Sequence, residues 1–300
     1  MDEFLEKIKN AAKVVCLHHN DVDGHCSAAI VDRFFEGKVN FYSMDYSREL
    51  PLGDMSEGCV VVIVDYSPGS LEDFHKILKI TQNLVWIDHH KTALEKFKEL
   101  EHLPGLRRDG TAACELAWEY FFQCVVPYSV ALMGDYDVWK FAYGAKTTHF
   151  QSGLRLEDTR PFNQKLWGDL LGGNNSEIEA IITNGQIITR YNDKAWERSL
   201  RAVGYHTTLD GLHCIACNIQ GSSDVFKSMN CKNIDAFIVY GHSGRNFKCT
   251  IYKEKNSTVD VSRIAVKHGG GGHAGASGFY CETLPFKFEG RLTKEDFHKE

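Results

Sequence analysis

The sequence lacks the features of a membrane or exported protein. Its longest uninterrupted apolar run, residues 59–64, is six residues long, whereas a helix that crosses a bilayer needs about 20. The first twenty residues mix acidic and basic side chains without an apolar core or a small-residue cleavage site, so they do not indicate an export signal. We therefore expect a cytoplasmic protein with no membrane partner.

The sequence also lacks an excess of positive charge, internal repeats and low-complexity tracts. Its 34 Lys and Arg against 40 Asp and Glu give a formal net charge of −6, which argues against a protein that coats long duplex nucleic acid. The 43% of apolar and 25% of charged side chains are typical of a globular chain with a sizeable core. A chain of 300 residues allows one large domain or two ordinary ones.

A paired zinc-binding pattern is missing as well. The sequence has ten cysteines, but its one C-x-x-C pair, Cys214 and Cys217, has no second pair to complete a zinc site. Other cysteines, such as Cys16 and Cys249, lie singly in apolar stretches. We expect buried thiols rather than disulfides.

Short apolar runs alternate with amphipathic segments in the first half of the chain. The runs are rich in β-branched residues and have no polar alternation, which is typical of strands covered on both faces. Between them, residues 27–35 and 71–78 have apolar side chains at helical spacing. This alternation predicts an α/β fold with a doubly wound parallel sheet. The predicted strands cover residues 13–17, 39–42, 60–64 and 84–87.

The second half of the chain has a different pattern. Residues 176–205 predict one long helix that connects two domains, and short β-like runs follow Gly204, with a helix-like stretch over 259–267. We predict a first domain over residues 1–186, a helical linker over 187–208, and a smaller α/β domain over 209–300.

Carboxylates and imidazoles follow three of the predicted strands at the point where each strand ends. Because the carboxyl ends of parallel strands meet at one edge of a sheet, we expect these side chains to lie close together. A further acid follows the short apolar stretch of residues 131–133. The side chains at these four places are His19, Asp21, Asp23, Asp65, Asp88, His89, His90 and Asp135.

Taken singly, these residues have ordinary explanations. Asp65 could cap a helix, residues 19–24 could form an acidic turn, and Asp137, which competes with Asp135, could make a salt bridge. Together, however, the carboxylates and imidazoles outnumber the ligands of a structural zinc. Two cations about 3.5–4 Å apart can activate water and stabilise the leaving alkoxide of a phosphate ester. The carboxylates suit Mn²⁺ or Mg²⁺, and the imidazoles favour Mn²⁺.

Five segments of the chain resemble the DHH family of phosphoesterases, which includes RecJ-type exonucleases and nanoRNases. In order, HNDVDG, VDYS, IDHHKT and MGDYD resemble the four motifs of the catalytic domain. GGGGHAGASGF, at residues 269–279, resembles the signature of the substrate domain that accompanies it. The resemblance implies a catalytic, metal-binding domain over residues 1–186 and a substrate-binding domain over 209–300.

The resemblance also implies the roles of particular residues. Two Mn²⁺ ions, with Mg²⁺ as the alternative, are expected as cofactors, and Asp88 is expected to bridge them. His90 is expected to contact the scissile phosphate or to support a neighbour. The implied metal ligands are His19, Asp21, Asp23, Asp65, Asp88, His89 and Asp135, and the implied catalytic residues are Asp88, His89 and His90.

The glycine run points to an anion site in the second domain. Successive backbone amides without side chains can surround a phosphate. The family's substrate domain often carries an arginine on the preceding strand, where this sequence has Tyr252, so Arg245 or Lys248 could replace it. The implied substrate-binding residues are Gly270, Gly271, Gly272, His273 and Arg245.

A phosphodiesterase accounts for both domains. A chain of 300 residues with a net charge of −6 has little room for the basic modules that hold long single strands. The resemblance therefore implies short single-stranded RNA or DNA, a linear dinucleotide or a nucleoside bisphosphate as the substrate, and allows a homodimer. The alternative is a non-catalytic nucleotide sensor. A sensor that had lost its activity should lack acids in one or more motifs, whereas all four motifs here retain them.

Overall fold

The chain divides into two compact units. A computed structural model describes residues 3–45, 48–230, 232–272 and 274–298. The units are Met1–Ile188 and Thr189–Glu300. The boundary between them falls inside one continuous helix, α9 (Asn175–Val203), which agrees with the long helix predicted over residues 176–205.

The first unit contains the predicted parallel sheet. Its strand order is β2-β1-β3-β4, and every pair of neighbours is parallel. All four predicted strands are confirmed, and so is the α/β fold class. The strands are β1 (Val14–His19), β2 (Val39–Met44), β3 (Val60–Val64) and β4 (Leu84–Ile87).

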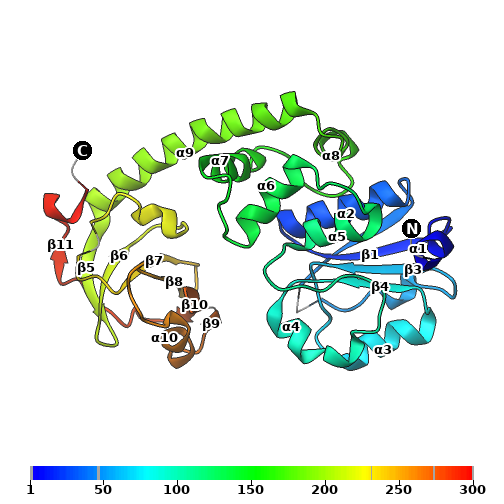
Figure 1. The fold of residues 1–300 in the computed structure, drawn as a ribbon. Helices are drawn as coiled ribbons and strands as arrows, with labels where there is room; N and C mark the ends of the chain where they lie inside the picture. Colours follow the sequence, from blue (N-terminus) through cyan, green and yellow to red (C-terminus); the bar gives the residue numbers. More distant parts are fainter. Residues whose placement is uncertain (1–2, 46–47, 231, 273, 299–300) are drawn as a thin grey trace. The chain divides into compact units, whose positions relative to one another are not determined.

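Both faces of this sheet are covered by helices, which explains the continuous apolar runs. Successive side chains point to opposite faces, so that Val62 and Val64 join one apolar cluster and Ile63 joins another. Helices α2 and α5 cover one face, and α3 and α4 lie on the other (Figure 1). The helices of this unit are α1 (Glu3–Ile8), α2 (Val22–Phe34), α3 (Leu71–Ile80), α4 (Lys91–Lys96), α5 (Ala113–Phe122), α6 (Tyr128–Asp137), α7 (Ala145–Leu154) and α8 (Gln164–Leu171), with 3-10 turns η1 (Leu52–Asp54) and η2 (Lys98–Leu100).

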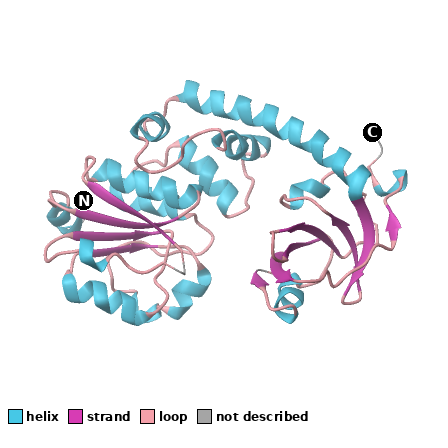
Figure 2. Ribbon diagram, turned by 180° about the vertical axis from the view of Figure 1, so that it is seen from behind, coloured by secondary structure: helices cyan, strands magenta, loops and turns pink. Residues whose placement is uncertain are grey.

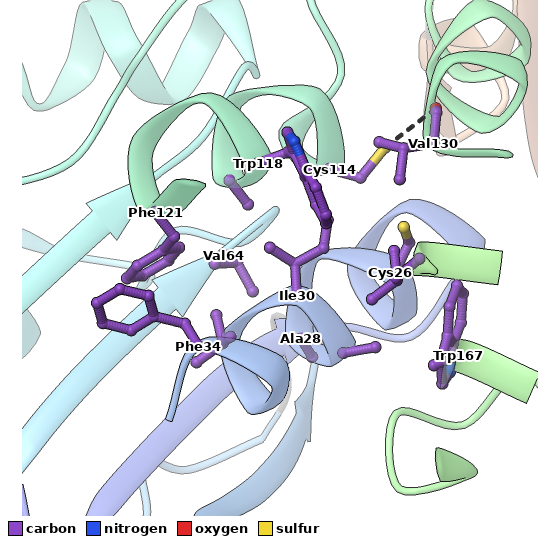
Figure 3. Close-up of a cluster of buried hydrophobic side chains, with 14 of the residues drawn as sticks. Cys26, Ala28, Ile30, Phe34, Val64, Cys114, Trp118, Phe121, Val130 and Trp167 are labelled. Carbon is purple, nitrogen blue, oxygen red and sulfur yellow. Dashed lines mark hydrogen bonds between the residues drawn. The ribbon is translucent and has the colours of Figure 1, made fainter. Parts of the chain in front are cut away.

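The first of these clusters fixes helices α2 and α5 against each other. Ile30 and Phe34 of α2 meet Trp118 and Phe121 of α5 (Figure 3), and the ring centroids of Phe34 and Phe121 are 4.8 Å apart. Side chains packed as densely as in a protein interior leave neighbouring helices little room to move relative to each other. The cluster therefore fixes both helices, whose first turns carry Asp23 and the two amides that bond it.

The second unit contains a mixed sheet with the order β11-β5-β6-β7-β8-β10-β9. Its strands are drawn in magenta in Figure 2. Among the described strands, β6 and β7 pair in parallel, and the other neighbours are antiparallel. One apolar cluster of this unit includes Ile238 and Phe279, and a second includes Phe226 and Phe237. The elements are β5 (Gly204–Leu209), β6 (Leu212–Cys217), η3 (Ser223–Phe226), β7 (Ala236–His242), β8 (Phe247–Lys253), α10 (Val261–Lys267), β9 (Gly271–Gly272), β10 (Ala276–Cys281), β11 (Gly290–Arg291) and η4 (Lys294–Asp296).

Two expected absences can be compared with the described residues. Each cysteine in that part of the chain is free, including Cys214 and Cys217, which are buried. Within the same part, none of the helices has both the length and the apolar character needed to cross a bilayer.

Candidate metal centre

Three strands of the first unit deliver ligand-type side chains to one edge of the sheet. Strand β1 ends at His19, β3 is followed by Asp65, and β4 is followed by Asp88. Because β1, β3 and β4 are parallel neighbours, these ends lie side by side. Asp65 has a left-handed backbone, φ 54°, a conformation that aspartate tolerates better than most residues. The sheet topology itself therefore assembles the cluster.

The ligand-type side chains form three overlapping groups. Within each group, one nitrogen or oxygen atom from every member lies within 4.8 Å of the others. Asp65 belongs to two groups and His89 to two, so the three groups form one continuous cluster. The groups are His19–Asp21–Asp65, Asp65–His89–His90 and Asp23–His89–Asp137.

His89 lies at the centre of this cluster. Its Nε2 is 3.3 Å from Asp65 Oδ1, 3.5 Å from Asp137 Oδ2 and 3.7 Å from Asp23 Oδ2. Burial is the main reason that the pKa of His89 is lowered, which keeps its imidazole neutral at neutral pH. A neutral imidazole surrounded by carboxylates is a donor set that suits a divalent cation.

Two buried carboxylate oxygens of the cluster lack a partner. Among the described residues, Asp65 Oδ2 and Asp137 Oδ2 have no hydrogen-bond partner. Burial, together with the charges of Asp23 and Asp21, raises the pKa of Asp65 well above its ordinary value and that of Asp137 to about 8. Such carboxylates are costly to bury unless a cation compensates them. The residues present therefore fit a bound divalent metal.

The remaining ligand-type residues are held in place by hydrogen bonds. His19 Nδ1 donates to Asp21 Oδ2 at 2.7 Å, which leaves Nε2 for a metal. Asp21 also caps helix α2 by accepting the Gly24 amide at 2.9 Å. Asp23 accepts the amides of Ala113 and Cys114 at 2.9 and 2.8 Å. Carboxylates and imidazoles oriented in this way are typical of metal sites.

Asp88 directly precedes two residues of the cluster, His89 and His90. It is fully buried and accepts the amides of His89 and His90 at 2.7 and 3.1 Å, the Ser67 hydroxyl, and His90 Nδ1 at 2.7 Å. Burial by itself would raise the pKa of Asp88. The hydrogen bond to His90 and the charge of that residue outweigh burial, so the pKa of Asp88 is lowered. The three ligand groups found in the described part of the chain do not include Asp88. These bonds orient His90, and the bridging role expected of Asp88 stays a prediction.

The structure also separates Asp135 from Asp137. Asp137 lies in the ligand cluster, whereas the buried carboxylate of Asp135 accepts the amides of Ala142 and Tyr143 at 2.8 and 3.2 Å and the hydroxyl of Thr147. On a helix with 3.6 residues per turn, side chains two positions apart point about 200° apart. The described ligand groups therefore contain Asp137, the competing candidate of the fourth motif, and do not contain Asp135.

The predicted anion site lies in the second unit. Gly271 and Gly272 form β9, which pairs with β10, and the amide of Gly270 donates to the Ala265 carbonyl at 2.8 Å. Arg245 is exposed in the turn between β7 and β8. His273 lies outside the described residues. The three glycines are thus consecutive, with Gly270 directly before β9, and their role in binding stays a prediction.

The model of the DHH family's N-terminal domain matches residues 13–137. This segment begins just before β1, ends with α6, and contains every residue of the three ligand groups. Residues 13–137 of this chain therefore match a DHH-family N-terminal domain. The prediction of a metal-dependent phosphoesterase, made from the order of the motifs, is confirmed at the level of the family.

Several known proteins are similar to this chain over most of its length. The uncharacterized protein R106 of Acanthamoeba polyphaga mimivirus is 24% identical over 305 residues, covering 90% of this chain and 68% of that protein.

Solved structures share the fold at lower sequence identity. The DHH domain of a member of a ribosomal protein family has a TM-score of 0.57 at 13% identity, over 93% of this chain and 85% of that one. RecJ from Thermus thermophilus in complex with Mn²⁺ has a TM-score of 0.50 at 15% identity, over 93% and 51%. An exopolyphosphatase-related protein from Bacteroides fragilis has a TM-score of 0.50 at 15% identity, over 97% and 91%.

Proposed function

We propose that this chain is a Mn²⁺-dependent phosphodiesterase that hydrolyses short oligonucleotides or linear dinucleotides to mononucleotides. The observation that carries the proposal is the cluster at the sheet edge, in which two buried carboxylate oxygens lack partners in the described part of the chain. The Mn²⁺ complex of RecJ, which has the same fold, supports the choice of ion. Mg²⁺ is the alternative.

The ligand groups suit a pair of ions. We assign one ion to the group His19–Asp21–Asp65 and the other to the group Asp23–His89–Asp137. Bound there, the ions would polarise a phosphoryl oxygen and lower the pKa of a water molecule. The protein's own contribution is to hold these side chains rigidly, through the cap at Asp21 and the two amide bonds to Asp23.

His90 is the residue we assign to the scissile phosphate. Its Nδ1 donates to Asp88 and lies 3.9 Å from Asp65 Oδ1. The hydrogen bond to Asp88 raises the pKa of His90, which favours the protonated imidazole. A protonated His90 can then donate from Nε2 to a non-bridging oxygen and balance the charge that develops there.

The second unit is the proposed substrate-binding domain, with residues 187–208 as its helical linker. We assign substrate binding in this unit to Gly270, Gly271, Gly272, His273 and Arg245, on the resemblance of residues 269–279 to the family signature. The net charge of −6 supports short substrates, because long single strands need extended basic grooves.

An activity panel tests the proposal. We expect Mn²⁺-loaded protein to release mononucleotides from RNA of five nucleotides or fewer, and the Asp137→Asn variant to lose this activity. Glu72→Gln is the matched control, because Glu72 is an acid of the same unit that is 80% exposed and outside the cluster.

Other results of the panel would change the assignment. Cleavage of a nucleoside bisphosphate alone would indicate a phosphatase of the same family. Protein that binds Mn²⁺ and nucleotides but cleaves none of the substrates would indicate a nucleotide sensor and overturn the proposal.

A further inference from the structure

An aromatic segment directly follows the metal cluster along the chain. Asp137 is the last residue of α6, and Tyr136, Trp139 and Phe141 surround that helix end. The ring centroid of Trp139 is 6.2 Å from that of Tyr136 and 5.5 Å from that of Phe141. Trp139 is 66% exposed. Packing in the core therefore does not explain why a tryptophan occupies position 139.

The backbone of this segment is unfavourable for its side chains. Trp139 and Phe141 have φ angles of 56° and 52°, in the left-handed region that bulky residues rarely adopt. Helix α6 ends with two bonds, from the Trp139 amide to Tyr136 and from the Lys140 amide to Asp135, at 3.1 and 3.0 Å. Glycine is the usual residue at the position of Trp139 in this motif.

Asp135 holds this strained segment in place. Its carbonyl accepts the Lys140 amide, while its carboxylate accepts the amides of Ala142 and Tyr143 and the Thr147 hydroxyl. Strained residues persist where their surroundings over-determine them, and they gather at functional sites. The two acids of the fourth motif thus serve adjoining features, Asp137 the metal cluster and Asp135 the aromatic segment.

We propose that Trp139, supported by Tyr136 and Phe141, is a stacking platform for a nucleobase of the substrate. Two residues of backbone span at most about 7 Å, so the ring lies within a nucleotide's reach of Asp137. Aromatic rings bind bases of any sequence through their faces. The inference rests on the proposed function and adds that the cluster is selective for phosphodiesters that carry a base next to the phosphate.

The test replaces Trp139 with glycine, because glycine removes the ring and suits the left-handed backbone. We expect Trp139→Gly to raise the KM for a short RNA about 10-fold while kcat changes little. An oligonucleotide with an abasic residue in place of each nucleoside should be cleaved equally by both proteins. Trp139→Phe, which keeps a ring, should recover most of the loss.

Gln123→Gly is the matched control. Gln123 also has a left-handed backbone, φ 51°, at the end of helix α5. That end is about 15 Å along the helix axis from Ala113, the residue that contacts Asp23. The control should change neither KM nor kcat.

Equilibrium binding separates this inference from the proposed function. Binding of adenosine 5′-monophosphate to Mn²⁺-loaded protein, followed by tryptophan fluorescence and calorimetry, should weaken about 10-fold in Trp139→Gly. An unchanged Kd and an unchanged KM would overturn the platform even if the wild type cleaves RNA. A weakened Kd in a protein that cleaves no substrate would keep the platform and reject the phosphodiesterase.

Discussion

At the scale of single residues, the two acids of the fourth motif have opposite environments. Asp137 has a buried oxygen that no described residue bonds and a pKa raised to about 8. In contrast, Asp135 accepts two amides and a hydroxyl, which keep its pKa low although burial opposes this. The unpartnered oxygen of Asp137 is available to a cation, whereas three donors already occupy lone pairs of Asp135.

Exchanging each acid for its amide should separate these roles. Asp137→Asn should lower Mn²⁺ affinity by at least about 10-fold and change the free energy of unfolding by less than about 1 kcal/mol. Asp135→Asn should cost about 1–3 kcal/mol, because its amide nitrogen would face backbone donors. Calorimetric titration and denaturant unfolding measure both quantities, and equal loss of Mn²⁺ affinity in the two variants would contradict the assignment.

The raised pKa of Asp137 also predicts how pH affects the metal-free protein. The folded state binds a proton at this carboxyl up to about pH 8, whereas the unfolded state releases it near the ordinary value of 3.8. Stability should therefore fall as pH rises from 6.5 to 8.5. The raised pKa of His90 acts in the same direction.

Thermal melts in the presence of a chelator measure this effect. The wild type should melt at a lower temperature at pH 8.5 than at pH 6.5, and Asp137→Asn should lose part of that difference. Mn²⁺ should stabilise the wild type more at the higher pH, since protons then compete less for the ligands. The same pH dependence in the two proteins would show that Asp137 is not the responsible group.

At the scale of secondary-structure elements, the junction of β1 and α2 brings His19, Asp21 and Asp23 together. Gly24 makes this junction possible, because a Cβ atom at this position would lie 2.3 Å from the carbonyl oxygen of His19. The oxygen belongs to the backbone, so it cannot move aside by a side-chain rotation. The close approach thus fixes His19 against the first turn of the helix that Asp21 caps.

Gly24→Ala should consequently disturb both the fold and the cluster. We expect a loss of more than about 2 kcal/mol in stability and weaker Mn²⁺ binding in the protein that still folds. Gly168→Ala is the matched control, since Gly168 lies within helix α8 with open space where its Cβ would be. The control should gain up to about 1 kcal/mol, and a similar gain in Gly24→Ala would refute the tight junction.

At the scale of the whole molecule, the ligand cluster and the two apolar clusters of the second unit belong to different parts of the chain. Every residue of the three ligand groups lies in the first unit. The core of each unit consists of apolar side chains and does not depend on an ion. Metal binding should therefore change backbone stability mainly within the first unit.

Hydrogen exchange with and without Mn²⁺ tests this expectation. Protection should increase over residues 18–24, 64–67, 87–90 and 134–139, and change little over residues 204–230 and 232–272. Removal of Mn²⁺ with a chelator should restore the original exchange without unfolding either unit. Protection that increases first over the second unit would place the principal metal site elsewhere.

The sequence by itself determined the parallel sheet, because strands covered on both faces must be apolar throughout, as in residues 60–64. It also determined that Asp65 and His89 meet, since parallel strands end at one edge. Only the tertiary structure placed Asp137 and not Asp135 in the described ligand groups, bonded Asp88 to His90, and left Trp139 exposed. Those outcomes depend on where each side chain points after the helices have packed, and the spacing of residues along the chain does not fix that direction.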